Sequence, residues 1–282
     1  MNRLSPTQLR QEINARNIER GRDFDHELSA GATPSVIYCG AGATHGNFLP
    51  AAYARIIANP AWRRRLKKAY TASRLIPRAA DRRRYELECA SGSDALLMNV
   101  FCYPSATRNR GLCALLGIER GTQPEFGIRA RIPLGNGGTD RTEIDMRLGF
   151  LLVEAKLTEG DFQRAPMQRL AQYRDAEAVF DLSALPIRNG VMDAWQLVRG
   201  VLAAHARTAS FAVICDRRRP DLIDAWFTVM RAVSCARASA SSPGRRSRRM
   251  CRRASNASSP KSTASRADWS QSACSSCSRL RT

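Results

Sequence analysis

The spacing of hydrophobic residues changes along the chain from the period of helices to that of strands. Between residues 48 and 118, apolar side chains recur every three or four residues, and Pro60 and Pro104 interrupt the pattern. This spacing is typical of amphipathic helices with one buried face. It predicts helices over residues 48–70, 85–103 and 107–118, ahead of a region in which the period falls to two residues.

Strands follow in the middle of the chain. Residues 126–132 alternate between apolar and polar, the turn sequence LGNGGTD comes next, and residues 144–148 alternate again. Because successive side chains of a strand point to opposite faces, this alternation predicts two strands joined by a hairpin-type turn. After Gly149 the run FLLVEAKL is almost continuously apolar, as in a central strand that is buried on both faces.

The remaining pattern completes an α/β fold. It predicts helices over residues 161–180 and 190–205, a last strand at SFAVIC, and a helix with Trp226 and Val229 on its buried face. The expected core is a central mixed sheet flanked by helices over residues 85–233. Residues 1–84 would form a helical N-terminal extension with a basic segment, and residues 234–282 a disordered C-terminal tail.

Charge is distributed unevenly over these three segments. The chain carries 45 Lys and Arg against 25 Asp and Glu, a formal net charge of +20. Residues 232–282 contribute +10 of it, residues 55–84 contribute another +10, and the rest of the chain is neutral. A basic excess favours a polyanionic partner such as nucleic acid. Within residues 55–84, a phosphate-contacting patch and a merely solvated helix face are equally open for five residues: Arg63, Arg64, Arg65, Lys67 and Lys68.

The composition of the C-terminal tail differs from that of the other segments. Residues 232–282 contain 15 Ser and 9 Ala, and the few large apolar residues follow no period. Such a segment buries too little apolar surface to offset the entropy of ordering, so it is predicted to be disordered. Two origins are open: a natural basic tail that contacts phosphates, or translation of a shifted frame in a GC-rich gene. The abrupt change after Val233 favours the shifted frame.

Cysteine usage and hydropathy favour a reducing compartment. The chain has 9 Cys, an odd count, and those that precede the tail show no paired spacing, so no disulfide framework is expected. No window of about 18 apolar residues and no apolar leader segment are present, so we expect neither a membrane span nor a signal peptide. We therefore expect a cytoplasmic protein without a membrane partner.

Three ionisable residues stand out within the predicted strands: Asp145, Glu154 and Lys156. Glu154 and Lys156 are two residues apart in an apolar strand and so share a face, and the turn at Gly149 can bring Asp145 opposite Glu154. Charges in an apolar strand are costly unless they are paired or bind a metal. Carboxylates, together with the backbone carbonyl of Ala155, would suit Mg²⁺, which can bind phosphate oxygens as well. A structural salt bridge is the alternative.

Asp145 and the triplet Glu154-Ala155-Lys156, set in the order helix, three strands, helix and strand, resemble the PD-(D/E)XK nuclease superfamily, which has the restriction-endonuclease-like fold. Segments such as ELECASGSDALLMNVFCYP and VEAKLTEGDF also resemble uncharacterised bacterial proteins described as restriction endonucleases. The resemblance covers most of residues 45–233. It implies a nuclease that cleaves DNA with Mg²⁺ or Mn²⁺, with Asp145 and Glu154 as metal ligands and Lys156 as the catalytic lysine. Ile144 stands where the superfamily usually has proline.

The same resemblance suggests further site residues. Some superfamily members add a glutamate from the first core helix, for which Glu88 is preferred here over Glu86. Relatives of the recombination-exonuclease type carry a glutamine on the helix after the lysine strand, which suggests Gln168 as a DNA contact. Arg217, Arg218 and Arg219 could contact phosphate or precede a helix start. An ordinary solvated position is the alternative for Glu88 and for Gln168.

Other functions are either open or disfavoured. A module of the same fold could bind nucleic acid without catalysis, or the charged residues of the strands could be purely structural. The three histidines, His26, His45 and His205, lack metal-ligand spacing, which disfavours HNH nucleases and zinc enzymes. The sequence contains no Walker loop and no nucleophile elbow. The oligomeric state is open, a homodimer included.

Overall fold

The computed structural model describes residues 3–29, 34–40, 42–69, 85–234 and 280–281. Most of the tail for which disorder is predicted, and residues 70–84 of the basic segment, lie outside the described residues.

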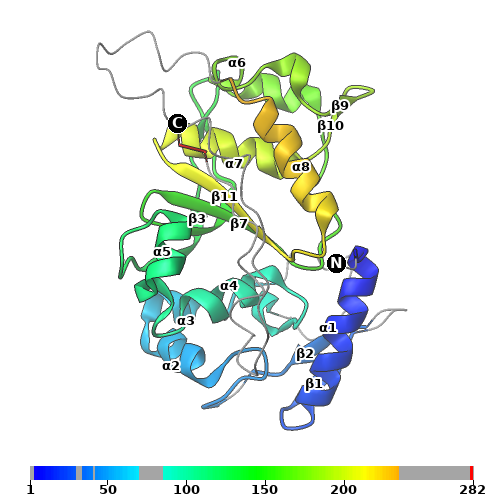
Figure 1. Cartoon of the computed structure of the whole chain (residues 1–282), viewed down its shortest axis with the longest axis vertical. Helices are drawn as coiled ribbons and strands as arrows, with labels where there is room; N and C mark the ends of the chain where they lie inside the picture. Colours follow the sequence, from blue (N-terminus) through cyan, green and yellow to red (C-terminus); the bar gives the residue numbers. More distant parts are fainter. Residues whose placement is uncertain (1–2, 30–33, 41, 70–84, 235–279, 282) are drawn as a thin grey trace, which may run out of the picture.

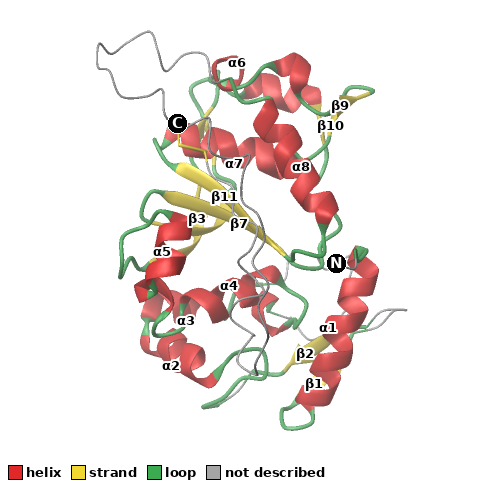
Figure 2. Ribbon diagram, viewed as in Figure 1, coloured by secondary structure: helices red, strands yellow, loops and turns green. Residues whose placement is uncertain are grey.

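A five-stranded mixed sheet forms the centre of the molecule (Figure 2). Its spatial order is β12-β11-β7-β6-β3. Strand β11 runs parallel to β7, and the other neighbours are antiparallel. The bounds are Pro124–Arg129 for β3, Glu143–Leu148 for β6, Leu151–Lys156 for β7, Ser210–Cys215 for β11 and Leu280–Arg281 for β12. The predicted mixed sheet is therefore confirmed, and SFAVIC forms β11 as the pattern indicated.

Helices cover both faces of the sheet (Figure 1). One face packs against α7 (Trp195–Ala206) and α8 (Pro220–Arg231), and the other packs against α4 (Ser93–Phe101) and α5 (Arg110–Leu116). Each face has its own hydrophobic core, with Leu152 and Phe211 in one and Val153 and Ala212 in the other. Gly200 allows α7 to approach the sheet, because a Cβ at this position would lie 2.1 Å from the Phe211 ring. The predicted α/β core with flanking helices is confirmed.

The N-terminal extension packs on the core through helices and a small hairpin. It contains α1 (Pro6–Gly21), the paired strands β1 (His26–Leu28) and β2 (Val36–Tyr38), α2 (Pro50–Ala58) and α3 (Pro60–Arg65). Helix α1, which the hydrophobic pattern did not indicate, begins with a capping box between Ser5 and Gln8. Arg218, which follows β11, contacts Glu12 of α1 at 2.7 Å. The extension is thus joined to the sheet by specific contacts.

Two predicted helices differ from the structure. Residues 85–103 form a short 3₁₀ turn, η1 (Glu86–Glu88), before α4 begins at Ser93. Here Cys89 forms a bridge with Ile37 and the N–H of Ala90 donates to Val36, so pairing with β2 extends the backbone and delays the helix.

The predicted helix over residues 161–180 is also wrong. That segment contains β8 (Ala165–Pro166), the 3₁₀ helix η3 (Met167–Gln172) and the single turn α6 (Ala176–Val179). Ala165 pairs with Met192 of β10 (Val191–Met192), which pairs in turn with β9 (Ile187–Arg188). The shorter elements are η2 (Ala106–Arg108), η4 (Leu182–Ala184) and the hairpin of β4 (Ile132–Pro133) with β5 (Thr139–Asp140). Pairing between distant segments therefore overrides the local helical spacing.

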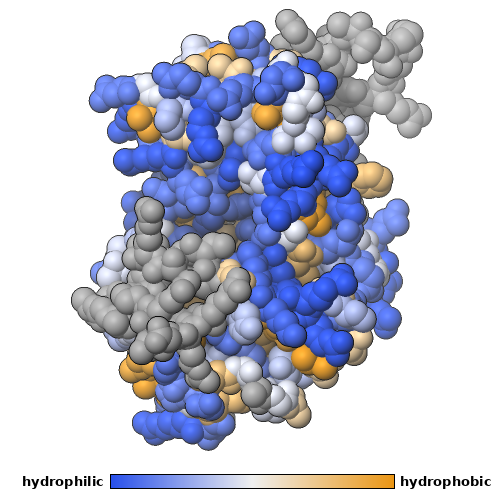
Figure 3. Space-filling model, turned by 180° about the vertical axis from the view of Figure 1, so that it is seen from behind, coloured by the Kyte–Doolittle hydropathy of each residue, from blue (hydrophilic) through white to orange (hydrophobic). Residues whose placement is uncertain are grey.

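The described residues on the face shown in Figure 3 are mainly hydrophilic. Figure 3 shows the face opposite to that of Figure 1, on which hydrophobic residues form small separate patches. None of the helices in the described part of the chain combines the length and the apolarity that a membrane crossing requires.

A buried histidine in the N-terminal extension makes the stability of the fold depend on pH. His45 is 7% exposed, its Nδ1 accepts the N–H of Asn47 at 3.1 Å, and its ring centroid lies 5.0 Å from that of Phe48. Burial lowers the pKa of His45 to about 4. The unfolded chain takes up this proton near its ordinary pKa, whereas the folded chain resists it until the pH is lower.

We expect the free energy of unfolding to fall by about 3 kcal/mol as the pH drops from 7 to 4, through His45 alone. The His45→Asn variant keeps an acceptor for the Asn47 N–H but does not titrate, so its unfolding free energy should lack this share of the dependence. Urea denaturation at several pH values measures the difference. Parallel pH profiles for the two proteins would show that His45 is protonated equally in both states.

Candidate active site

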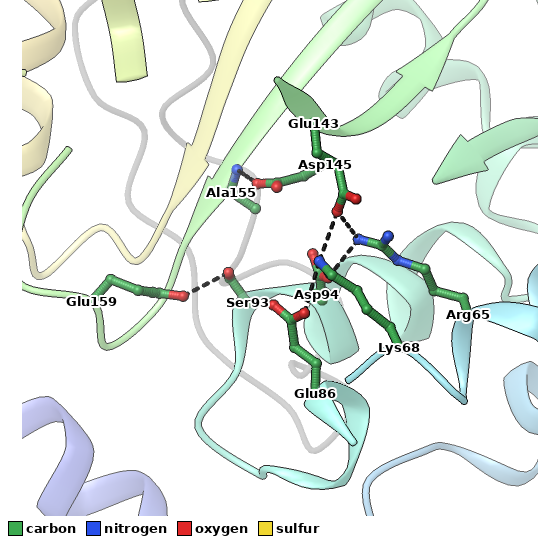
Figure 4. Close-up of polar contacts among 9 residues, drawn as sticks. All are labelled: Arg65, Lys68, Glu86, Ser93, Asp94, Glu143, Asp145, Ala155 and Glu159. Carbon is green, nitrogen blue, oxygen red and sulfur yellow. Dashed lines mark hydrogen bonds and ion pairs between the residues drawn. The ribbon is translucent and has the colours of Figure 1, made fainter. Parts of the chain in front are cut away.

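The hairpin of β6 and β7 brings the predicted strand residues together. Gly149 makes the turn with φ +58, and the register pairs Leu148 with Leu151 and Met146 with Val153. Beyond Met146 the regular pairing ends, and Asp145 Oδ2 accepts the N–H of Ala155 at 2.8 Å (Figure 4). The predicted juxtaposition of Asp145 with the Glu154-Ala155-Lys156 triplet is present.

Glu154 and Lys156 form a buried ion pair on the α7 face of β7. They are 5% and 6% exposed, and Lys156 Nζ lies 2.8 Å from Glu154 Oε1. The ammonium also lies 5.7 Å from the ring centroid of Phe162. Their i, i+2 spacing places both side chains on one face, as the sequence predicts.

The backbone of Ala155 faces Asp145. In an extended strand the N–H and the C=O of one residue point to the same neighbour. Since the Ala155 N–H donates to the Asp145 carboxylate, the Ala155 carbonyl faces the same side of β7. Two carboxylates and one carbonyl, all hard oxygen donors, therefore lie at the place where β6 and β7 separate.

Both carboxylates have pKa values above the usual range. Burial raises the pKa of Asp145, and the neighbouring Glu154 and Asp94 carboxylates raise it further. Burial also raises the pKa of Glu154, which the ammonium of Lys156 offsets only in part. Burial alone would lower the pKa of Lys156, but the surrounding carboxylates, Glu154 first among them, keep it above its usual value.

A second group of charges adjoins Asp145 on the α4 side of the sheet. We call it the ion-pair cluster, and Figure 4 shows its five members: Arg65, Lys68, Glu86, Asp94 and Glu143. Arg65 Nη2 lies 2.7 Å from both Asp94 Oδ2 and Glu143 Oε1. Lys68 Nζ lies 2.7 Å from Glu86 and Glu143 and 3.3 Å from Asp94. The cluster joins the N-terminal extension to α4 and β6.

The position of Arg65 depends on a glycine in the neighbouring strand. Gly127 of β3 has φ +64, and a Cβ on it would lie 2.0 Å from Arg65 Nη1. Only glycine adopts this conformation freely and leaves room for the guanidinium. The ion-pair cluster is therefore built on a local break in the alternation of β3.

The loop after β7 contributes one more acid. Glu159 Oε1 accepts from the Ser93 hydroxyl at 2.7 Å, and Oε2 accepts the N–H of Leu157 at 2.6 Å. Arg219 is 0% exposed and holds this loop, because its guanidinium donates to the carbonyls of Glu159 and Gly160 at 2.9 Å each. The negative charge of Glu159 contributes to the raised pKa of Lys156.

Together with Arg199 of α7, whose positive charge lowers the pKa of Glu154, the ionisable residues at and beside the two carboxylates leave a formal excess of two negative charges, which one divalent cation would neutralise. They are six acids and four bases: Glu86, Asp94, Glu143, Asp145, Glu154 and Glu159 against Arg65, Lys68, Lys156 and Arg199. Within the described residues, no group of three or more His, Cys, Asp or Glu side chains is arranged to hold a metal ion. A cation here would have two carboxylates, a carbonyl and water as ligands, which is a set that Mg²⁺ accepts.

The other predicted site residues lie apart from this pair of carboxylates, and the five basic ones fall into two groups. Of the five basic residues predicted to contact nucleic acid, Arg63, Arg64 and Lys67 are exposed, whereas Arg65 and Lys68 are held in the ion-pair cluster. Gln168 is exposed on η3, which is a short 3₁₀ helix and not the regular helix that was predicted.

Glu88, the preferred extra ligand, accepts the N–H of Tyr85 at 3.0 Å and so caps its own turn. Glu86, the second choice, contacts Lys68 instead. Asp94, whose negative charge raises the pKa of Asp145, was missed. It lies in the first turn of α4. Because the helix was predicted to begin at residue 85, the sequence did not mark Asp94 as an acid at a helix N-terminus. Glu143 was also missed, although it lies two residues before Asp145.

Comparison with known proteins gives one result. The model of a family described as "Restriction Endonuclease associating with ARP" matches residues 20–250. Neither the curated proteins nor the solved structures contain a match to the chain. The matched range spans both the ion-pair cluster and the β6–β7 hairpin.

Proposed function

The chain belongs to the family of restriction endonucleases associating with ARP, and from this membership and the site we propose that it is a metal-dependent nuclease that hydrolyses phosphodiester bonds in DNA. The family supports a nuclease-like module with DNA as its partner. Specificity for Mg²⁺ or Mn²⁺, the roles of individual residues, a cytoplasmic location and a homodimer stay predictions.

The observation that carries the proposal is the close group of the half-buried Asp145 with the buried Glu154 and Lys156. Burial raises the pKa of both carboxylates, and the negative charge of Glu154 raises the pKa of Asp145 further. A divalent cation would relieve this repulsion, and Asp145, Glu154 and the Ala155 carbonyl are the residues that would hold it. Mg²⁺ would supply neutralisation of the phosphate charge and activation of water.

Lys156 would act directly on the reacting phosphate. Its ammonium is fixed by Glu154 at 2.8 Å, so it needs no reorganisation to serve as a donor. From this position it would orient the attacking water or stabilise the negative charge that develops on the phosphate oxygens. Glu154 thus has two roles: it positions Lys156 and would share in holding the cation.

Cleavage of supercoiled plasmid DNA by the Asp145→Asn variant tests the proposal. We expect the wild type to cleave with Mg²⁺ or Mn²⁺ and to stop with a chelator, and we expect Asp145→Asn to be at least ~100-fold slower. Without metal, Asp145→Asn should be as stable as the wild type or more so, because it removes one of two repelling carboxylates. Divalent metal should raise the melting temperature of the wild type but not that of the variant.

Asp224→Asn is the matched control, since Asp224 is exposed on α8. It should cleave like the wild type. Equal rates for the wild type and Asp145→Asn would contradict the proposal. A wild type that binds DNA duplex but never cleaves it would instead support a non-catalytic binding module.

A further inference from the structure

Arg199 lies on α7 beside the strands that carry the candidate active site. Helix α7 packs on β7, and the positive charge of Arg199 lowers the pKa of Glu154. Its Nη1 donates to Thr142 Oγ1 at 2.7 Å, directly before β6 begins. The half-buried guanidinium thus lies between β7, with Glu154, and the start of the strand that carries Asp145.

The hydrogen-bonding capacity of this guanidinium is met only in part. Among the described residues, the bond to Thr142 is its one hydrogen bond, Nε is buried without a partner, and no carboxylate lies within ion-pair distance. Asp140, the other acid that senses its charge, is already bonded to Tyr173 and to the N–H of Thr142. A guanidinium has five donors, so Arg199 retains donors for a further acceptor.

Aromatic packing holds the side chain in place. The guanidinium carbon lies 5.8 Å from the ring centroid of Trp195, and Tyr173 packs edge-on against the same ring at 5.8 Å. Arg169 also lies near this ring, at 5.9 Å. Because the arginine is already ordered, binding an anion would cost little side-chain entropy.

Three arginines follow β11; Arg217 is exposed, whereas the side chains of Arg218 and Arg219 are engaged within the fold. Arg218 pairs with Asp216 and Glu12, and Arg219 pairs with Asp221 and two carbonyls. These contacts engage Nε and both terminal nitrogens of each guanidinium. Arg199 differs from Arg218 and Arg219 because no carboxylate of the described residues contacts it.

We propose that Arg199 is a phosphate-binding residue that donates to a non-bridging oxygen of the DNA at or next to the scissile bond. The planar guanidinium fits a phosphate with two parallel hydrogen bonds. On this view α7 supplies the anion-binding group, while β6 and β7 supply the carboxylates and the lysine. The inference rests on the proposed nuclease function.

DNA binding and cleavage by Arg199→Gln and Arg199→Lys test the inference. Binding of a duplex is measured with Ca²⁺ in place of Mg²⁺, at several salt concentrations, and cleavage is measured with Mg²⁺. Arg199→Gln should lower kcat/KM by about 10–100-fold and reduce the slope of log Kd against log salt by about one. Arg199→Lys should keep the slope but still lose about tenfold in kcat/KM, since an ammonium cannot make the paired contact.

Two controls separate phosphate binding from a structural role. Arg188→Gln removes the same charge from the exposed strand β9, which Figure 1 places far from α4, and should leave kcat/KM unchanged. Thr142→Ala removes the internal partner of Arg199 but leaves the guanidinium, so it should keep the full salt slope.

The outcomes distinguish this inference from the proposed function. If the wild type cleaves DNA while Arg199→Gln matches Arg188→Gln in kcat/KM and in salt slope, Arg199 does not bind phosphate. If Arg199→Gln does not fold, wild-type kcat/KM for Arg199→Lys overturns the inference. A wild type that neither binds nor cleaves DNA refutes the nuclease function itself.

Discussion

The Lys156→Met variant is expected to bind DNA but to cleave it at least ~100-fold more slowly than the wild type. Methionine keeps most of the volume of the buried side chain but removes the ammonium that Glu154 fixes at 2.8 Å. Any charge that the ammonium stabilises on the reacting phosphate is then uncompensated. Single-turnover cleavage with Mg²⁺, together with duplex binding in Ca²⁺, separates the chemical step from affinity.

Loss of folding has to be separated from loss of chemistry in this experiment. Lys156→Met leaves Glu154 buried without its partner, so we expect its melting temperature to fall. The double variant Glu154→Gln/Lys156→Met has no unpaired charge on this face of β7 and should regain stability while remaining inactive. A Lys156→Met protein that cleaves at the wild-type rate would show that Lys156 is only the counterion of Glu154.

The Arg65→Met variant should lower the free energy of unfolding by about 3–5 kcal/mol, the largest stability effect that we expect from one side chain. Arg65 is 10% exposed and contacts two carboxylates at 2.7 Å each. Without it, Lys68 alone would have to neutralise Asp94, Glu143 and Glu86. Urea denaturation of both proteins measures the loss.

Arg64→Met is the matched control, because Arg64 is the exposed neighbour in α3. Its unfolding free energy should stay within about 0.5 kcal/mol of the wild type. If Arg65→Met is as stable as Arg64→Met, the ion-pair cluster does not hold the N-terminal extension on the sheet.

The stabilising effect of the same cluster should fade in acid. Burial raises the pKa of Glu143, but hydrogen bonds and charge from Arg65 and Lys68 outweigh this and lower it to about 2. The unfolded chain therefore binds this proton at a higher pH than the folded chain does. The associated stability is present above about pH 4.5 and is lost as the pH falls toward 2. The unfolding free energy of Arg65→Met should therefore depend less on pH in this range than that of the wild type.

Period and spacing were sufficient for the strands and for the central triplet of the site. Alternation of apolar and polar residues predicts β6, because side chains that are buried on one face of a sheet follow a period of two. Continuous apolar runs predict β7 and β11, as in strands that are buried on both faces. The i, i+2 spacing of Glu154 and Lys156 puts them on one face, and a tight turn at Gly149 brings Asp145 level with them. These are local properties of the backbone.

Which basic residues face solvent was decided only by tertiary structure. Arg63, Arg64 and Arg65 are adjacent and chemically identical in the sequence. The Arg65 side chain is only 10% exposed because its partners Asp94 and Glu143, which lie 29 and 78 residues further along the chain, converge on it. The position of Asp94 also depends on a distant segment. Cys89 pairs with Ile37, so α4 begins only at Ser93 and Asp94 lies in its first turn.

The sequence by itself therefore determined where β3, β6, β7 and β11 lie along the chain and that Asp145 lies near Glu154 and Lys156. Alternation did not settle every face, because Ile144 and Met146 lie in the cores on opposite faces of the sheet. The tertiary structure decided which charges surround that triplet. Hydrophobic period reports on neighbours a few residues away, whereas an ion pair depends on the convergence of distant segments. For this reason Arg199 and Asp94, which approach the triplet from α7 and α4, could be recognised only in the folded chain.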